Sequence, residues 1–328
     1  MERASIVYNP VARNAPRRER LLAATARLRD EGWEIDLLST EGPVHAVDLA
    51  KAAAKAGSRV VFSCGGDGTL NEVVNGLAGT EATLAVIRGG TGNVFAKEVG
   101  VAKDPERALR VLVEGEERRF DLGVAAPPAG PSRAPSTGSG QNSGGTSGRG
   151  GRYFILMAGV GIDGSVVRRV PERPKRLLGT TSYVLWGAAE ALRFRSRRTE
   201  IRLDGETREC ELYWLLVGNT RSYGGVVDVT FRAMADDGLL DAYVFAGRGL
   251  PWVVRTGARI ALQRQDGAAG VSFQRARRVE VLSPGLHVQA DGEYFGETPM
   301  TFSVAPRALR VLLPRGGGRR ILSRGGIS

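Results

Sequence analysis

Cysteine and histidine are scarce in this sequence. Its 328 residues include two cysteines, Cys64 and Cys210, and two histidines, His45 and His287. Two cysteines cannot form a disulfide framework, and their spacing fits no metal motif. Structural zinc sites need closely spaced sets of Cys and His ligands, so zinc chemistry is not expected.

Long apolar runs are also missing. The longest candidate, Tyr183–Leu192, falls far short of the roughly 18–20 residues that span a bilayer. The first ten residues, MERASIVYNP, pass directly into a strand pattern and show no cationic-then-apolar leader. We therefore expect a cytoplasmic protein, with any membrane contact peripheral and at the inner face of the membrane.

Acidic residues are outnumbered by basic ones. The 46 Lys and Arg against 35 Asp and Glu give a net charge of +11. Such a balance suits an anionic partner, such as a nucleotide, a nucleic acid or an acidic membrane surface, although an arginine-rich composition explains it equally well. No basic motif is interleaved with aromatic residues, so no nucleic-acid partner is predicted. A homodimer remains open, because the sequence does not determine the oligomeric state.

The most informative stretch is Val60–Gly76, VVFSCGGDGTLNEVVNG. Its apolar, β-branched start is typical of a buried strand. Glycines follow, and an apolar pattern with helical spacing begins at Thr69. Thr69 and Glu72 also fit a capping box. The sequence thus predicts a strand, a glycine turn and a helix start, which together form an anion site.

Asp67 distinguishes this turn from an ordinary strand-to-helix connection. The phosphates of a bound nucleotide would lie where this carboxylate is placed. A carboxylate in that position makes sense when a divalent cation or its water shell separates the acid from the phosphates. The turn therefore favours a nucleotide and Mg²⁺ over a purely structural role.

Strands alternate with helices through residues 1–124, which predicts a parallel, three-layer α/β domain. A second glycine loop, Gly89–Asn93, follows the apolar run Leu84–Ile87. Two such loops at the carboxyl ends of neighbouring strands would form a nucleotide crevice.

Beyond residue 124 the pattern changes. Residues 125–151 consist mainly of Gly, Ser, Pro, Ala and Thr, which predicts a flexible insertion without a core. Residues 152–305 are rich in short strands, including a hairpin that turns at Asp204-Gly205, and predict a mainly antiparallel β domain. A helix is expected over Pro174–Arg195.

The motif GGDGTLNEVVNG resembles the signature of the diacylglycerol-kinase-type lipid kinases, which are relatives of NAD kinase. GVGIDG at 159–164 and ADDGLLD at 235–241 also look like elements of that family. The resemblance extends from Ser5 to about Leu313, the glycine-rich insertion excepted. It implies an NAD kinase-like α/β nucleotide-binding domain and a C-terminal β-sandwich domain that binds the lipid. It also implies that residues 306–322 return to the first domain, leaving 323–328 as a tail.

The resemblance assigns roles to particular residues. Asp67 would organise the metal and its waters, and Glu293 would be the base that takes the proton of the lipid hydroxyl. Asp237 would bind a structural Mg²⁺, with carbonyls near Met234 and Leu239. Both Asp237 and Glu293 lie in Asp-Gly turns, which the residues alone explain as turns. The implied ATP-binding residues are Asn9, Thr40, Gly65, Gly66, Asp67, Gly68, Thr69, Leu70, Asn71, Glu72, Gly90 and Thr91.

One position departs from the family pattern. Val94 stands where the second glycine loop of the family normally carries an aspartate. We expect an ATP-dependent lipid kinase that converts diacylglycerol to phosphatidic acid. A sphingoid base, ceramide or phosphatidylglycerol remains open as the acceptor. An NAD kinase-like enzyme and a non-catalytic nucleotide or lipid sensor remain open as well.

Overall fold

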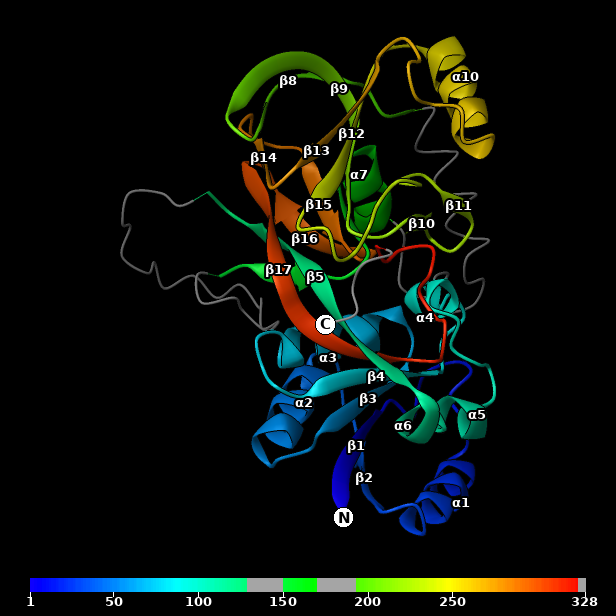
Figure 1. Cartoon of the computed structure of the whole chain (residues 1–328). Coiled ribbons are helices and arrows are strands. Elements are labelled where there is room, and N and C mark those ends of the chain that lie inside the picture. The colour runs from blue at the N-terminus through cyan, green and yellow to red at the C-terminus, as the bar shows by residue number, and fades with distance from the viewer. Residues whose placement is uncertain (129–149, 170–192, 324–328) are drawn as a thin grey trace, which may run out of the picture.

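The computed structural model describes residues 1–128, 150–169 and 193–323. Most of the predicted insertion, most of the predicted helix over Pro174–Arg195 and most of the tail lie outside these residues. Figure 1 shows two lobes, one above the other. The first lobe holds the N-terminus and the helices α1 to α6, and the second holds the antiparallel strands with α7 and α10.

The first lobe is built on a parallel sheet. Its strands lie in the order β4-β3-β1-β2, and β1 pairs in parallel with both β2 and β3. Helices cover both faces, as predicted for a three-layer domain (Figure 1). The strands are β1 (Glu2–Tyr8), β2 (Trp33–Ser39), β3 (Val60–Gly65) and β4 (Thr83–Arg88). The helices are α1 (Arg18–Arg29), α2 (His45–Lys55), α3 (Asp67–Leu77), α4 (Val94–Glu98), α5 (Pro105–Leu109) and α6 (Val111–Glu114).

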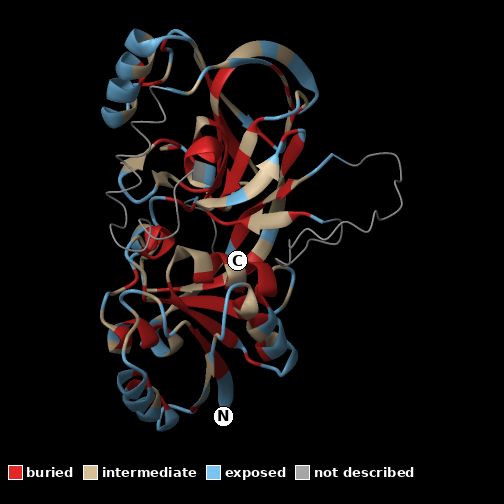
Figure 2. Cartoon of the chain, turned by 180° about the vertical axis from the view of Figure 1, so that it is seen from behind, coloured by how far each residue is buried: buried red, intermediate tan, exposed pale blue. Residues whose placement is uncertain are grey.

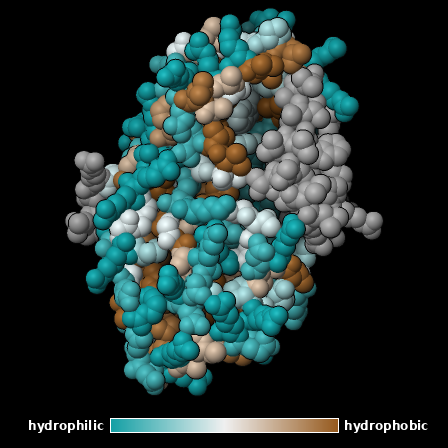
Figure 3. All heavy atoms as spheres, turned by 90° about the vertical axis from the view of Figure 1, so that its right-hand side faces the viewer, coloured by the Kyte–Doolittle hydropathy of each residue, from teal (hydrophilic) through white to brown (hydrophobic). Residues whose placement is uncertain are grey.

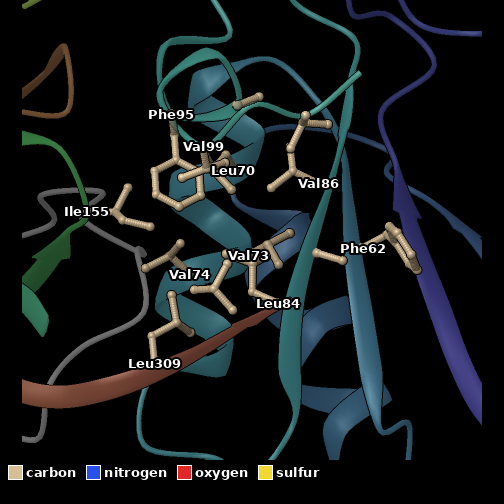
Figure 4. Close-up of a cluster of buried hydrophobic side chains, with 14 of the residues drawn as sticks. Phe62, Leu70, Val73, Val74, Leu84, Val86, Phe95, Val99, Ile155 and Leu309 are labelled. Carbon is tan, nitrogen blue, oxygen red and sulfur yellow. The ribbon is translucent and has the colours of Figure 1, made fainter. Parts of the chain in front are cut away.

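The core of this lobe surrounds β3 and α3. Every residue of β3 is buried, as expected of a central strand covered by helices on both sides. Figure 4 shows Leu70, Val73 and Val74 of α3 beside side chains of β4 and the C-terminal strand. Figure 2 shows the buried residues concentrated in the sheets of both lobes. This packing fixes the start of α3 relative to the end of β3.

The last strand, β17 (Met300–Leu313), belongs to both lobes. It pairs antiparallel with β14 (Arg278–Val281) of the second lobe and with β5 (Glu116–Ala126). Farther along, Arg310 and Val311 pair in parallel with β4 of the first lobe. The pairing with β5 shifts register between Ala305 and Leu309, where the strand crosses from one lobe to the other.

The second lobe is mainly antiparallel, as predicted. The hairpin at Asp204-Gly205 is confirmed, because β8 and β9 pair antiparallel around it and both turn residues have positive φ. Its helices are α7 (Ile162–Arg169) and α10 (Leu250–Ala261). Its further strands are β6 (Arg152–Phe154), β7 (Met157–Gly161), β8 (Arg197–Leu203), β9 (Glu206–Gly218), β10 (Ser222–Tyr223), β11 (Val227–Asp228), β12 (Leu240–Ala246), β13 (Val271–Ala276), β15 (His287–Ala290) and β16 (Glu293–Glu297).

The predicted capping box is wrong. Helix α3 begins at Asp67, two residues before Thr69, and its N-cap residue is the extended Gly66, which has no side chain to cap it. Thr69 instead accepts a hydrogen bond from Asn9, and Glu72 accepts from the backbone of residues near the start of α2. The first N–H groups of α3 therefore have no side-chain cap at Gly66.

Within the described ranges, no helix combines the length and apolarity needed to cross a membrane.

Candidate active site

A cavity of about 1250 Å³ lies between the two lobes. One end is polar and is lined by the two glycine loops of the first lobe and by Asp291, Gly292 and Glu293 of the second. The other end is lined mainly by apolar and aromatic side chains of the second lobe, from α7, α10, β9 and β12. A ligand with a charged part and an apolar part would match this division.

The two glycine loops touch each other through their backbones. The N–H of Gly89 donates to the carbonyl oxygen of Gly65 at 2.8 Å. A Cβ added to Gly90 would lie 2.5 Å from the Cα of Gly66, which is closer than real Cβ atoms come. The close approach therefore requires glycine, and it forms a continuous floor at the carboxyl ends of β3 and β4.

The first turn of α3 faces the polar end of the cavity. Gly66, Asp67, Gly68 and Thr69 all line it. The first N–H groups of an α-helix have no carbonyl partner within the helix, so they are donors for an anion. Asn9 holds this turn in place, because its Nδ2 donates to Thr69 Oγ1 at 2.9 Å and its backbone N–H donates to the Cys64 carbonyl.

Asp67 connects the two loops. Its Oδ1 accepts a hydrogen bond from the backbone N–H of Val94 at 2.7 Å. Burial raises the pKa of Asp67, and this N–H and the nearby charge of Lys97 oppose the increase. Val94 thus contributes its backbone to the site in place of the carboxylate that the family pattern places there.

Glu293 reaches the same turn from the second lobe. Its Oε2 accepts a hydrogen bond from Arg152, which also binds Asn71 Oδ1 through Nε at 3.0 Å and Nη2 at 2.6 Å. A Cβ added to Gly68 would lie 2.9 Å from Glu293 Oε1. The carboxylate is therefore oriented by Arg152 on one side and lies against the start of α3 on the other.

Asp291 joins the lobes from a half-buried position. Its carboxylate accepts hydrogen bonds from the backbone N–H groups of Ile155, Leu156 and Met157, at 2.8 to 3.0 Å. It also accepts from Asn71 Nδ2 at 2.7 Å. Burial raises the pKa of Asp291, whereas these N–H groups favour its charged form. These bonds also explain why the chain forms two strands here, with β6 ending at Phe154 and β7 beginning at Met157.

The cavity brings most of the predicted ATP-binding residues together. Three of them do not line it. Gly65 is the last residue of β3 and packs against Gly89, Leu70 belongs to the hydrophobic core, and Asn71 is buried and bonded to Arg152 and Asp291. Those that line the cavity are Asn9, Thr40, Gly66, Asp67, Gly68, Thr69, Glu72, Gly90 and Thr91, together with Glu293.

Two residues that orient the site are not predicted from the sequence. Arg152 and Asp291 act through partners about 80 to 220 positions away in the chain, Asn71 and Glu293 among them. The only local signal is that Asp291 immediately precedes Gly292-Glu293. Pairs so distant in the sequence leave no periodic pattern that could identify them.

The predicted metal residues lie outside the cavity. Asp237 Oδ1 accepts from the N–H of Leu239 at 3.0 Å, and Met234 Sδ lies 3.2 Å from an Arg221 nitrogen. Two further carboxylates belong to the same neighbourhood. Asp121 accepts from the N–H of Gly238 at 2.6 Å, and the buried Asp241 Oδ2 has no hydrogen-bond partner among the described residues.

These residues partly fit a hard cation. Carboxylate oxygens are the ligands that Mg²⁺ prefers, and Asp241 Oδ2 is a buried oxygen without a donor in the described part of the chain. However, no group of three or more Asp, Glu, His or Cys side chains in the described residues is arranged to hold a metal ion. A cation at Asp237 would therefore need waters or backbone carbonyls as additional ligands.

The apolar end of the cavity is formed by aromatic side chains. Trp214 stacks on Phe245 with ring centroids 5.0 Å apart and meets Tyr223 edge to face at 5.3 Å. Asp163 is a buried carboxylate among these apolar side chains, and it accepts hydrogen bonds from Tyr223 and from Gln289 Nε2. Burial raises the pKa of Asp163, while its hydrogen bonds lower it.

Comparison with known proteins identifies the family. Residues 3–125 match the family model of the diacylglycerol kinase catalytic domain. Residues 157–313 match that of the YegS C-terminal NAD kinase beta sandwich-like domain. The resemblance seen in the sequence is thus confirmed, and so is the two-part fold.

Individual relatives agree with these matches. A diacylglycerol kinase of Mycobacterium tuberculosis is 30% identical and covers 96% of each chain. A diacylglycerol kinase of Bacillus subtilis is 29% identical over 96% of this chain and 97% of the relative. A protein of Pseudomonas putida named "Probable lipid kinase YegS-like" is 32% identical over 91% of this chain and 92% of its own.

A solved structure supports the fold. The crystal structure of a diacylglycerol kinase from Bacillus anthracis has a TM-score of 0.67 and 18% identity, and the similarity covers 99% of this chain and 98% of that one. The chain therefore belongs to the diacylglycerol kinase family of lipid kinases.

Proposed function

We propose that this lipid kinase transfers the γ-phosphoryl group of ATP to the hydroxyl group of diacylglycerol, giving phosphatidic acid and ADP. One observation carries the proposal. The glycine loops, the Glu293 carboxylate and an apolar compartment share a single cavity between the lobes. A phosphate donor and an apolar acceptor could therefore meet beside one carboxylate.

The phosphates of ATP would bind at the polar end. The uncapped start of α3 offers N–H donors at Asp67, Gly68 and Thr69, and the backbone contact of the two glycine loops leaves room for the ligand to approach. Gly90 and Thr91 line the same end. This arrangement supports ATP as the phosphoryl donor, in agreement with the family to which the chain belongs.

Glu293 would act as the general base. In the transfer, the acceptor oxygen forms a bond to the γ-phosphorus, and the bond from that phosphorus to the β,γ-bridging oxygen breaks. The electron pair leaves with ADP, and the proton of the acceptor hydroxyl passes to Glu293. The contact with Arg152 fixes Oε2, and Oε1 lies toward Gly68, beside which the phosphates would bind.

Mg²⁺ is proposed as the metal. Asp67 would hold the waters of a nucleotide-bound ion, and Asp237 would hold a structural ion with carbonyls near Met234 and Leu239. When bound with ATP, the ion neutralises charge on the phosphates. Asp67 supports this role because it is half-buried at the polar end, with Oδ1 bonded to the Val94 N–H and Oδ2 toward Gly92.

The apolar compartment supports a lipid acceptor over NAD. Its lining includes Trp214, Phe245 and the inner side of α10, which offer few groups for the charged and hydroxyl-rich parts of a dinucleotide. Diacylglycerol is favoured because relatives that match nearly the full length of this chain carry that name. A sphingoid base, ceramide or phosphatidylglycerol would use the same base and the same compartment.

The test is phosphate transfer from radiolabelled ATP to each candidate lipid in mixed micelles, with NAD as a further acceptor. Wild type is compared with Glu293→Gln and with Glu297→Gln, which removes a charge from the same strand. We expect labelled phosphatidic acid, and a loss of about 10²- to 10⁴-fold in kcat for Glu293→Gln alone. Asp67→Ala should also abolish transfer.

Other outcomes would contradict parts of the proposal. Label in a different lipid would keep the mechanism and change the acceptor. Label in NADP would overturn the lipid assignment. ATP binding without transfer to any acceptor would favour a nucleotide sensor.

A further inference from the structure

Helix α10 has two different sides. Trp252, Val253, Thr256 and Ile260 line the apolar end of the cavity, so they form its inner side. The other side faces water. Its large apolar side chains are unusually exposed, at 53% for Leu250, 62% for Val254 and 66% for Leu262. Isolated exposed apolar residues are common, but two in one short helix and a third at its C-cap, Leu262, indicate a surface that another apolar phase covers.

The same side is basic. Residues 247–265 contain four arginines and no acidic residue. Arg255, Arg259 and Arg264 are exposed, and in the part of the chain that the structure describes none of them forms an ion pair. The helix therefore presents apolar side chains next to uncompensated positive charge, which is the composition of helices that lie in the surface of an anionic membrane.

The helix is anchored firmly enough to present this side. Trp252 donates from Nε1 to the carbonyl of Ala269 at 3.0 Å, and its ring meets Tyr213 edge to face at 5.6 Å. Gln265 just after the helix is buried and donates to the carbonyl of Val229 at 2.8 Å. Both ends are thus tied to the second lobe.

A neighbouring loop carries a further exposed apolar residue. Val226 is 65% exposed, precedes β11 and lines the cavity. Because α10 contacts β11, this loop lies near α10. Figure 3 views the molecule from the side on which α10 lies and shows apolar side chains gathered in the upper part of that face.

We propose that the outer side of α10 is the surface by which this enzyme docks on a bilayer that contains anionic phospholipid. We define this docking surface by Leu250, Val254, Arg255, Arg259 and Leu262. The proposal rests on the proposed function, since a lipid kinase must reach an acceptor that stays in the membrane. A lipid leaving the bilayer would cross only the width of one helix, roughly 10 Å, to enter the cavity.

The test is sedimentation with vesicles made of equal parts phosphatidylcholine and phosphatidylglycerol, and with vesicles of phosphatidylcholine alone. The variant Arg255→Gln/Arg259→Gln should lower the partition coefficient on the anionic vesicles about 25-fold, roughly fivefold for each arginine. The control Arg29→Gln/Lys55→Gln removes the same charge from exposed helix ends of the first lobe and should bind like wild type. Val254→Gln should weaken binding to both kinds of vesicle.

A second measurement separates docking from catalysis. With a short-chain diacylglycerol dissolved as monomers, all three variants should retain wild-type kcat and KM, since the described lining of the cavity includes none of the changed residues. With long-chain diacylglycerol in anionic vesicles, the arginine and valine variants should lose activity and the control should not.

The outcomes of the two proposals are distinguishable. Wild-type protein that fails to bind anionic vesicles, or an arginine variant that binds as well as the control, would overturn the docking surface and leave the kinase assignment intact. Vesicle binding that depends on α10 in a protein without any transfer to lipid would support the docking surface and contradict the kinase proposal.

Discussion

Gly68 and Glu293 meet across the interface between the lobes. Gly68 lies in the first turn of α3, and a Cβ at this position would come within 2.9 Å of Glu293 Oε1. The absence of a side chain at Gly68 thus makes room for the proposed base. The proposed site is therefore built from both lobes, since each lobe supplies one of the two residues.

The variant Gly68→Ala should separate activity from stability. Alanine favours a helix over glycine by about 0.5 to 1 kcal/mol, so the thermal midpoint should stay the same or rise. The added methyl would displace the carboxylate, and we expect kcat to fall about 10- to 100-fold. Differential scanning fluorimetry and the lipid phosphorylation assay measure the two effects.

A double-mutant cycle provides the control for this prediction. In the Glu293→Gln background, Gly68→Ala should cause little further loss, because the group it displaces no longer acts as a base. Full activity of Gly68→Ala would show that Glu293 does not act where the structure places it.

Glu72 should matter for stability. Its carboxylate accepts from the N–H groups of Val44 at 3.0 Å and Ala46 at 3.2 Å, at the start of α2. Glu72→Ala leaves both donors without this partner, so the free energy of unfolding should fall by about 1 to 2 kcal/mol. Glu72→Gln keeps one acceptor oxygen, so its free energy of unfolding should fall by less. Urea denaturation measures the free energy of unfolding of both variants. Equal stability of Glu72→Ala and Glu72→Gln would contradict the prediction.

The sequence predicted the parts of the fold that depend on local pattern. The buried run Val60–Phe62, the glycine turn and the Asp204-Gly205 hairpin each have a short-range physical cause, and the structure contains all three. The capping box failed because α3 begins earlier than the sequence pattern predicted. With Gly66 as the N-cap, Glu72 lies beyond the first turn of α3, and its carboxylate accepts hydrogen bonds from the start of α2 instead.

The sequence predicted less of the candidate site than of the fold. Resemblance located Asp67 and Glu293, and the cavity brings them together. Arg152 and Asp291 could not be predicted because their roles arise only when β6, β7 and α3 pack together. The exposure of the apolar side chains on the outer side of α10 could not be predicted for a related reason. Only the tertiary structure shows which of its apolar residues stay exposed.

Asp163 should make stability depend on pH. Burial raises its pKa in the folded state above the unfolded value, so folding favours the protonated form. The stability contributed by this proton is present at low pH and is lost as pH rises through the folded pKa. Asp163→Asn should therefore be more stable than wild type at pH values above the folded-state pKa of Asp163. This difference in stability should shrink as the pH falls toward the pKa that Asp163 has in the unfolded chain.

Thermal midpoints of both proteins across the pH range measure this difference. Asp163→Glu, which keeps the charge, is the control for changed packing. A constant difference between Asn and wild type at every pH would contradict the assignment, because it would show that Asp163 does not titrate differently on folding. We also expect KM for the lipid to change more than KM for ATP, since Asp163 lies among the aromatic residues of the apolar end.

The two cysteines should differ sharply in reactivity. Cys64 is fully buried before the glycine turn, and burial raises its pKa to about 12, so it stays a neutral thiol at ordinary pH. Cys210 is only partly buried. Native protein treated with N-ethylmaleimide should therefore carry at most one label, on Cys210, and unfolded protein should carry two. Mass spectrometry of tryptic peptides distinguishes the sites. Rapid labelling of Cys64 in the native protein would show that the end of β3 opens. In that case a bound nucleotide should slow the labelling.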